Sequence, residues 1–512
     1  MPCSTEVNIF VLTNMKKAKK ELIDFIKTLS EEDSRVFNKF LDAYREHLEL
    51  PSPEEKLILM DAQLALIFLV RSGLSVSEAA ERLSAHNLGG FYAHEALSWY
   101  PLDDAAKIYP ISMKFGKMPI FRLSCYLKSD VIPEILQMAL TFTIKRFPSF
   151  ATIVRKGVFW HYLDSVKRRF PVNADKGVPC QSLRISSVGT QSFQVLYHAN
   201  RISVEFFHVL TDGTGGMVFL KTLVGEYLRI LGVPQVVGRG VLDVNSAPQH
   251  LETTNDFERL CPKIKKSGGF AGPAAAQMGG KIARRSPCKV VQLVYDTEDL
   301  LCCAHSYGVS LSSFILALMF HAQMNSTEVF NGKIQMQVPV NMRKFFPQSQ
   351  TLRNFSMYCS IDLGHEDITD FKTTAELVSR QLTERSTYDE MTVMMSTARK
   401  LVRSLRFIPL AIKSPVAKMI YGFLGDSRFS NTLSNLGRIE LPAEIAPYVE
   451  GFDFVLGTCV VSRASCSMCS FGNSTVLSIS KNTRDPSFEE RLSALSRELG
   501  LEVSYVETQL YD

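Results

Sequence analysis

The chain has 512 residues, of which 46% are hydrophobic and 21% are charged, with a net charge of +5. These values exclude a disordered or collagen-like chain and a membrane bundle, and the mild basic excess is far from that of a nucleic-acid-binding protein. The length predicts two to four packed units rather than one compact core.

The number of cysteines and the first residues of the chain indicate the cellular compartment that we expect. Eleven cysteines, including the adjacent pair Cys302 and Cys303, are an odd number and do not resemble a disulfide framework, so we expect a reducing cytoplasm. Residues 466–469 form a lone CxxC without a second pair at zinc spacing, and we expect no metal site there. Residues 1–6 lack a secretion signal, and the longest apolar stretch, residues 62–70, is about half of the roughly 20 residues that span a bilayer.

Two groups of basic residues stand out along the chain. No aromatic residues are interleaved with them, as they would be in a nucleic-acid-binding surface. We interpret both groups as solvated faces, with contact to an anionic partner as the alternative. Their members are Lys16, Lys17, Lys19 and Lys20 in the first group, and Lys263, Lys265 and Lys266 in the second.

Residues 1–95 are predicted to form a helical N-terminal extension. Ser52 is the expected N-cap of a helix that runs through the apolar stretch and stops at Gly73. Ser75 and Glu78 have the spacing of a capping box, which predicts a second helix start.

Residues 73–80 resemble the opening of a helix-turn-helix motif. The continuation, residues 84–90, lacks a short turn that leads into a basic recognition helix. We therefore expect a packing or partner module, and no contact with nucleic acid.

Residues 96–235 are predicted to form a first lobe of alternating strands and helices. Residues 120–127 have the pattern of a strand, and residues 131–147 that of an amphipathic helix. Residues 191–209 are predicted to form two strands separated by residues 199–200.

Residues 236–287 lose apolar periodicity and accumulate Gly, Pro and Ala, which predicts a linker or crossover. A second lobe, residues 288–512, is expected to follow. Its first elements are a strand near residues 288–295, a helix over residues 310–322 and a strand over residues 333–340.

His208 is the residue that we single out for chemistry. Residues 202–208 form a β-rich run that carries it to the end of a strand, where Asp212 and Gly213 turn the chain. A histidine in that position can face a cleft, and its ordinary pKa near 6.5 allows it to accept a proton as a general base. Without further context, such a histidine is more often a satisfied core residue.

The spacing of His208, Asp212 and Gly213 forms an HxxxDG pattern, and further segments match in the same order. With them, the sequence resembles the condensing acyltransferases of the chloramphenicol-acetyltransferase-like fold, and within these the bacterial alcohol acetyltransferase-like proteins. The resemblance covers roughly residues 95–505. The further segments are residues 100–110 (YPLDDAAKIYP), 338–343 (VPVNMR), 352–356 (LRNFS) and 434–437 (SNLG).

The resemblance implies an α/β (α+β) fold of two lobes, each with a mixed sheet, and a channel between them. His208 would deprotonate an alcohol or amine acceptor as it attacks an acyl thioester, either acyl-CoA or a carrier-bound acyl group, without a bound cofactor. Asp212 would pair with Arg343 and hold the loop. Gly213 would adopt a backbone conformation closed to residues with a Cβ atom.

The same resemblance suggests an oxyanion donor at Ser434 or Asn435, although these residues fit turn chemistry equally well. Two features differ from related groups. Phe207 stands where peptide-forming condensation domains carry a second histidine, and residues 451–457 are only weakly similar to the DFGWG motif of the plant BAHD acyltransferases. Two alternatives therefore stay open: a condensation-type enzyme that takes its acyl group from a carrier protein, and a catalytically idle binding or partner protein of the same fold.

Overall fold

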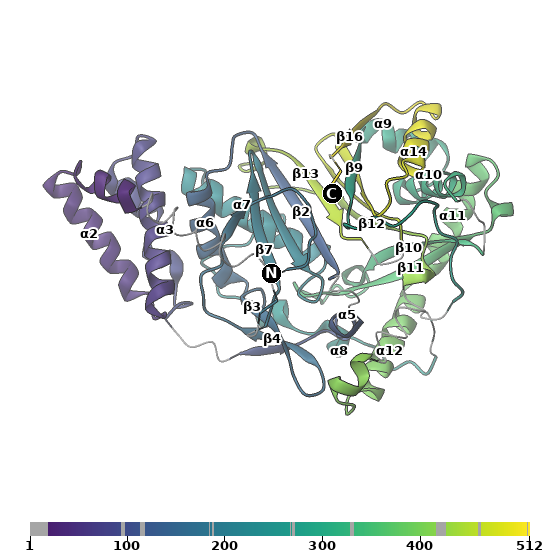
Figure 1. The fold of residues 1–512 in the computed structure, drawn as a ribbon, viewed down its shortest axis with the longest axis horizontal. Helices are drawn as coiled ribbons and strands as arrows, with labels where there is room; N and C mark the ends of the chain where they lie inside the picture. Colours follow the sequence, from purple (N-terminus) through teal and green to yellow (C-terminus); the bar gives the residue numbers. More distant parts are fainter. Residues whose placement is uncertain are drawn as a thin grey trace.

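The computed structural model describes residues 19–93, 98–112, 118–183, 185–186, 189–266, 268, 272–327, 332–415, 426–458, 462–508 and 510–511. The sequence features at residues 1–6, Lys16 and Lys17 lie outside these ranges. Figure 1 shows the N-terminal helices at one end of an elongated molecule, with two sheet-containing lobes following them.

Most described helices pack on one face of a sheet or on another helix. The α-helices are α2 (Glu31–Glu46), α3 (Ser52–Arg71), α4 (Val76–Arg82), α5 (Ile108–Ser112), α6 (Pro133–Thr143), α7 (Gly213–Leu231), α8 (Asp256–Arg259), α9 (Thr297–Ser306), α10 (Leu311–Asn325), α11 (Phe371–Arg385), α12 (Tyr388–Ser404) and α14 (Ser487–Glu498). The 3-10 helices are η1 (Ala85–Leu88), η2 (Ile144–Arg146), η3 (His250–Thr253), η4 (Met342–Lys344), η5 (His365–Asp367), η6 (Asp426–Arg428) and η7 (Ala446–Tyr448).

The described strands form three sheets. The first, in the order β1-β4-β3-β6, contains β1 (Trp99–Pro101), β4 (His161–Ser165), β3 (Thr152–Lys156) and β6 (Thr190–Gln191). The second, in the order β13-β2-β8-β7-β5, contains β13 (Val449–Leu456), β2 (Ile120–Leu127), β8 (Arg201–Phe207), β7 (Phe193–His198) and β5 (Val172–Ala174). The third, in the order β11-β10-β12-β14-β15-β9-β16, contains β11 (Ser356–Leu363), β10 (Ile334–Asn341), β12 (Asn431–Arg438), β14 (Ala464–Phe471), β15 (Ser474–Lys481), β9 (Lys289–Asp296) and β16 (Val503–Glu507).

The N-terminal helices pack against the first lobe and share its hydrophobic core. Helix α3 lies against α6, and Arg169 of the first lobe pairs with Asp61 of α3, with a second bond of 3.0 Å from Nη2 to Oδ1. The predicted N-cap Ser52 was wrong by one residue: Pro51 is the N-cap, and no side chain caps this end. The predicted capping box of Ser75 and Glu78 is confirmed.

The first lobe is built on the sheet of β2, β8, β7 and β5, with α6 and α7 packed together beside it. The predicted strand 120–127 matches β2, and the two strands predicted within 191–209 are β7 and β8. The predicted helix 131–147 is shorter, because α6 ends at Thr143 and tightens into η2.

Strand β13 comes from late in the chain yet completes the first-lobe sheet. It runs antiparallel to β2, with Phe454 opposite Leu123. Side chains of the second-lobe sheet also hold it, since Ser467 Oγ donates to the carbonyl of Phe454 at 2.5 Å and Ser480 Oγ to that of Leu456 at 2.5 Å. Residues 449–456 therefore belong to the first-lobe sheet, although they lie within the range 288–512 predicted for the second lobe.

The second lobe contains the third sheet, with α10 buried between neighbouring elements. The predicted strand 288–295 corresponds to β9, the strand 333–340 to β10, and the helix starting after the N-cap Ser310 to α10. In the described part of the crossover 236–287, the chain is irregular apart from the short η3 and α8 and isolated β-bridges at Gly238–Val241 and Ile282–Thr483. Among the described residues, no single helix is long and apolar enough to span a membrane, and one pair, α9 with α10, passes that test only across an 81° bend.

Candidate active site

A cavity of about 740 Å³ lies between the two lobes. One wall comes from the first lobe and β13, and the other from β10, β11 and β12. Strands β10 and β12 pair in parallel at Met336 with Asn431 and at Gln337 with Thr432. Beyond these pairs the cavity is lined by residues 338–341 of β10 and residues 433–437 of β12, so it enters the third sheet where the two strands separate.

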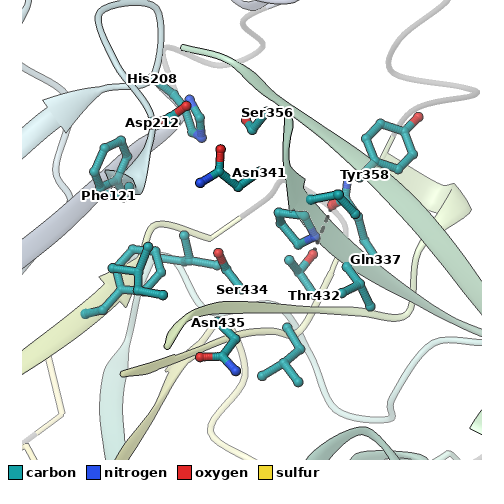
Figure 2. A pocket seen from close by; sticks show the side chains of 18 of the residues that line it. Phe121, His208, Asp212, Gln337, Asn341, Ser356, Tyr358, Thr432, Ser434 and Asn435 are labelled. Atoms are coloured by element: carbon teal, nitrogen blue, oxygen red, sulfur yellow. Dashed lines mark hydrogen bonds between the residues drawn. The ribbon is translucent and has the colours of Figure 1, made fainter. Parts of the chain in front are cut away.

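His208 lies in this cavity, at the end of β8. Its backbone N–H donates to the carbonyl of Pro119 at 2.9 Å, which fixes the strand end. The imidazole packs against two aromatic rings, with centroid distances of 5.4 Å to Tyr109 and 5.2 Å to Phe121. Figure 2 shows His208 and Phe121 across the cavity from the side chains of β10 and β12.

Asn354 is the direct polar partner of the imidazole. Its Nδ2 lies 3.2 Å from His208 Nδ1 and donates to the carbonyl of His208 at 3.2 Å. The amide orientation is fixed because Oδ1 accepts from the hydroxyl of Ser356 at 2.9 Å and from its N–H at 3.3 Å. Among the described residues, no group bonds the other ring nitrogen, Nε2.

The environment favours a neutral imidazole. Burial lowers the pKa of His208, and a hydrogen bond to its own backbone and the negative charge of Asp212 oppose this effect only in part. A neutral imidazole with a lowered pKa can still accept a proton transiently, which is the property that a general base needs.

Both oxygens of the Asp212 carboxylate accept hydrogen bonds from protein groups. Oδ1 caps α7 by accepting from the N–H of Gly215 at 3.0 Å. Oδ2 accepts from the N–H of Phe355 at 2.8 Å and from Nη1 of Arg343 at 2.7 Å. With these donors arranged around it, the carboxylate connects the start of α7 to the loop before β11.

Arg343 continues this connection. Its Nη2 donates to the carbonyls of Thr351 at 2.8 Å and Arg353 at 2.7 Å, and its Nε donates to Thr351 at 3.0 Å. The loop that Arg343 holds carries Asn354. The Asp212–Arg343 pair expected from the sequence is therefore present, and it contacts the loop that carries Asn354.

Gly213 does not have the backbone conformation that we expected. It is absent from the described glycines with positive φ, and it is the first residue of α7. Its constraint is steric, because a Cβ atom there would lie 2.5 Å from Cδ2 of Leu436. Gly215 is more constrained, since a Cβ atom would lie 2.1 Å from the carbonyl oxygen of Leu352.

Ser434 and Asn435 lie on β12 and have different surroundings. Nδ2 of Asn435 donates to Oγ of Ser312 at 3.1 Å, and Oδ1 accepts from the N–H of Gly437 at 2.7 Å. These bonds are the turn chemistry that the sequence left open. Ser434 lines the cavity without a hydrogen-bond partner among the described residues, on the side of β12 that faces His208 and Asn341 (Figure 2).

Sequence reasoning missed several residues of the site. Asn354 lies in the LRNFS segment, but nothing in the segment indicated a bond to His208, because the two residues are 146 positions apart. Tyr109 lies in the first matched segment and contacts the imidazole. Gln337 and Thr432 form a polar pair inside the cavity, with a 3.1 Å bond between their side chains.

Within the described ranges, no group of three or more His, Cys, Asp or Glu side chains could hold a metal ion.

No family model matches the chain, and no curated protein sequence matches it. Solved structures do match. TRI101 of F. sporotrichioides, in complex with coenzyme A and T-2, has a TM-score of 0.55 at 12% identity, covering 79% of this chain and 99% of that one. The trichothecene 15-O-acetyltransferase TRI3 of Fusarium sporotrichioides has a TM-score of 0.51 at 11% identity, covering 78% and 94%.

The first condensation domain of the CDA synthetase has a TM-score of 0.50 at 12% identity, covering 79% of this chain and 95% of that domain. At such identities the likeness establishes a shared fold. The fold class expected from the sequence, two lobes with mixed sheets of the chloramphenicol-acetyltransferase-like kind, is confirmed.

Proposed function

We propose that the protein is an acyltransferase that moves an acyl group, acetyl in the first instance, from acyl-CoA to an alcohol or amine, with His208 as general base. The observation that carries the proposal is the setting of His208: a histidine of lowered pKa whose Nε2 is free of partners among the described residues, in a cavity between two lobes. The cavity volume is within the usual range of small-molecule sites, about 300–1,000 Å³.

In the proposed reaction, Nε2 of His208 takes the proton of the acceptor O–H or N–H as that atom attacks the thioester carbonyl carbon. The tetrahedral intermediate then collapses, the C–S bond breaks, and the imidazolium returns its proton to the leaving thiolate. In this step Nδ1 carries a proton and donates it in a hydrogen bond to the backbone carbonyl of His208. The Nδ2 group of Asn354, which is itself a donor, then donates to that same carbonyl and not to Nδ1. Proton transfer of this kind contributes roughly 10² to 10⁴ in rate, and positioning contributes more.

Ser434 is the oxyanion donor that we favour over Asn435. Its hydroxyl faces the cavity, whereas both ends of the Asn435 amide are already bonded. Loss of one oxyanion donor typically lowers kcat by about 10²- to 10³-fold. We assign positioning roles to Asp212 and Arg343. Gly213, which has no Cβ atom, allows Leu436 to pack close to the start of α7.

The test is a screen of acyl-CoA donors against alcohols and amines, with thiol release followed by a thiol reagent. Wild type, His208→Ala and Ser434→Ala are measured together, with their melting temperatures. We expect near-complete loss of turnover for His208→Ala and a partial loss for Ser434→Ala, both with the fold retained. Unchanged turnover in His208→Ala would remove this residue as the base.

The same screen separates the remaining alternatives. An acyl group presented on a carrier protein is included as a second donor, and turnover with that donor alone would reject the free acyl-CoA proposal. If no donor supports turnover while acceptors or acyl-CoA still bind, the protein is a binding protein of this fold.

A further inference from the structure

An exposed surface outside the cavity combines apolar and basic side chains from two distant parts of the chain. We call it the apolar–basic face. Its apolar members are Val158, Phe159, Phe407, Ile408 and Ile412, and its basic members are Lys156, Lys400, Arg403 and Arg406. Val158 and Phe407 are 71% and 72% exposed, which is unusual for large apolar side chains in a packed fold.

The two parts of this face are joined by direct contacts. The tip of the β3–β4 hairpin and the chain just after α12 project on the same side of the molecule (Figure 1). The backbone N–H of Leu410 donates to the carbonyl of Val158 at 2.9 Å. Beneath them, Nζ of the buried Lys413 lies 3.2 Å from the ring centroid of Trp160 and donates to the carbonyl of Leu405 at 3.2 Å.

The charged members of this face are all basic, while Lys266 and Arg399 beside them pair with Glu390 and Glu258. Residues 391–415 contain five basic residues and no acidic one. The second basic group noted in the sequence adjoins them, because Nζ of Lys400 donates to the carbonyls of Lys265 at 2.8 Å and Lys266 at 3.2 Å. The exposed side chains of Lys263 and Lys265 therefore extend the positive surface.

We propose that the apolar–basic face docks the protein on an anionic membrane surface. The apolar side chains project from a hairpin tip and a helix end, which is the shape that inserts into a headgroup layer rather than one that receives a partner's helix. The basic side chains around them complement anionic headgroups, and each such charge strengthens binding to such a surface roughly fivefold.

The face lies near one wall of the cavity. Trp160, under the face, has Nζ of Lys107 5.9 Å from its ring centroid, and Tyr109, two residues further along the chain, lines the cavity beside His208. Docking there would bring the cavity near apolar molecules dissolved in the bilayer. The docking inference does not depend on the proposed acyl transfer, since it is tested by binding alone.

The test is co-sedimentation of the full chain with phosphatidylcholine vesicles, with and without phosphatidylglycerol, at low and high salt. We expect binding only to the anionic vesicles, weakened by salt. The double variant Arg403→Gln/Arg406→Gln should lower the partition coefficient roughly 25-fold. Phe407→Ser and Ile412→Ser should each lower it about tenfold or more, because each side chain loses its burial in the headgroup layer.

Val237→Ser is the matched control, because Val237 and Ile412 are both 61% exposed and Val237 lies outside the face. It should bind as wild type does, and all the variants should keep the wild-type melting temperature. Equal binding to neutral and anionic vesicles would overturn the proposal. The proposal would also be overturned if the protein did not bind vesicles and instead formed a dimer that Phe407→Ser dissociates. A complex with an acidic carrier protein that Phe407→Ser dissociates, again without vesicle binding, would overturn it in the same way.

Discussion

At the scale of single residues, His208 has a pKa lowered chiefly by burial, because burial penalises the charged imidazolium. The proposed base must be neutral before it accepts the proton of the acceptor. The folded protein keeps His208 neutral to a lower pH than an unfolded chain does, where the pKa is near 6.5.

The pH dependence of turnover follows from this shift. We expect kcat/KM to rise with pH as His208 loses one proton, with an acid limb whose midpoint lies below about 6.5, and to level off at higher pH. The free energy of unfolding should also fall as the pH falls below about 6.5. In that range the unfolded chain binds a proton at His208 more readily than the folded protein does, because the pKa is lowered in the folded state. A kinetic profile with its acid limb above that pH would contradict the assignment.

Asn354 is a positioning residue, since it touches the imidazole and no reacting atom. Asn354→Ala should lower turnover about 10²-fold by releasing the ring. Asn354→Asp keeps the size but places a carboxylate beside Nδ1, which raises the pKa of His208, so the acid limb should move to higher pH. Wild-type turnover in Asn354→Ala at an unchanged melting temperature would contradict the positioning role. An unmoved acid limb in Asn354→Asp would contradict the contact between residue 354 and His208.

At the scale of elements, the start of α7 is where the site depends most on close packing. Asp212 caps this helix, and the first turn passes close to Leu352 and Leu436. Gly215 meets a backbone oxygen there, whereas Gly213 meets only the end of a leucine side chain. The helix therefore carries Asp212 to Arg343 and lets the loop before β11 approach His208.

Gly215→Ala should destabilise the fold by about 1–3 kcal/mol or more, because the added Cβ meets a backbone oxygen that cannot move aside. Gly213→Ala should cost less, since only the end of a leucine side chain has to shift. Gly451→Ala is the control, because nothing lies within 4 Å of its Cβ position and its φ is not positive. Thermal unfolding of the three variants checks this order, and equal losses would contradict it.

Short sequence patterns correctly predicted the elements that are determined by interactions between nearby residues. Strand β2, the Ser75 capping box and the start of α10 follow from alternation and capping, which act over a few residues. The β13 pairing and the bond from Asn354 to His208 join distant residues, so no short pattern contains them. Gly213 was misread because close approach of another chain segment and a positive φ both select glycine, and only coordinates distinguish them.

At the scale of the whole molecule, β13 prevents the two lobes from being independent. Without residues 449–456, the first-lobe sheet has an open edge at β2, and an unpaired edge of this kind promotes aggregation. Residues 1–287 expressed alone should therefore be insoluble or unfolded, and co-expression with residues 288–512 should restore a folded complex. Circular dichroism and gel filtration test this, and a stable monomeric 1–287 fragment would contradict it.

Strand β13 also has a consequence for biosynthesis. At about 5–20 residues per second, roughly 12 to 50 s pass between the emergence of β8, which ends at Phe207, and that of β13, which ends at Leu456. During that interval the nascent first lobe displays an unpaired β2 edge, together with the aromatic side chains that later line one wall of the cavity. Ribosome-associated chaperones that bind exposed strands would find their target there, and slowing translation after residue 207 would lengthen the exposure.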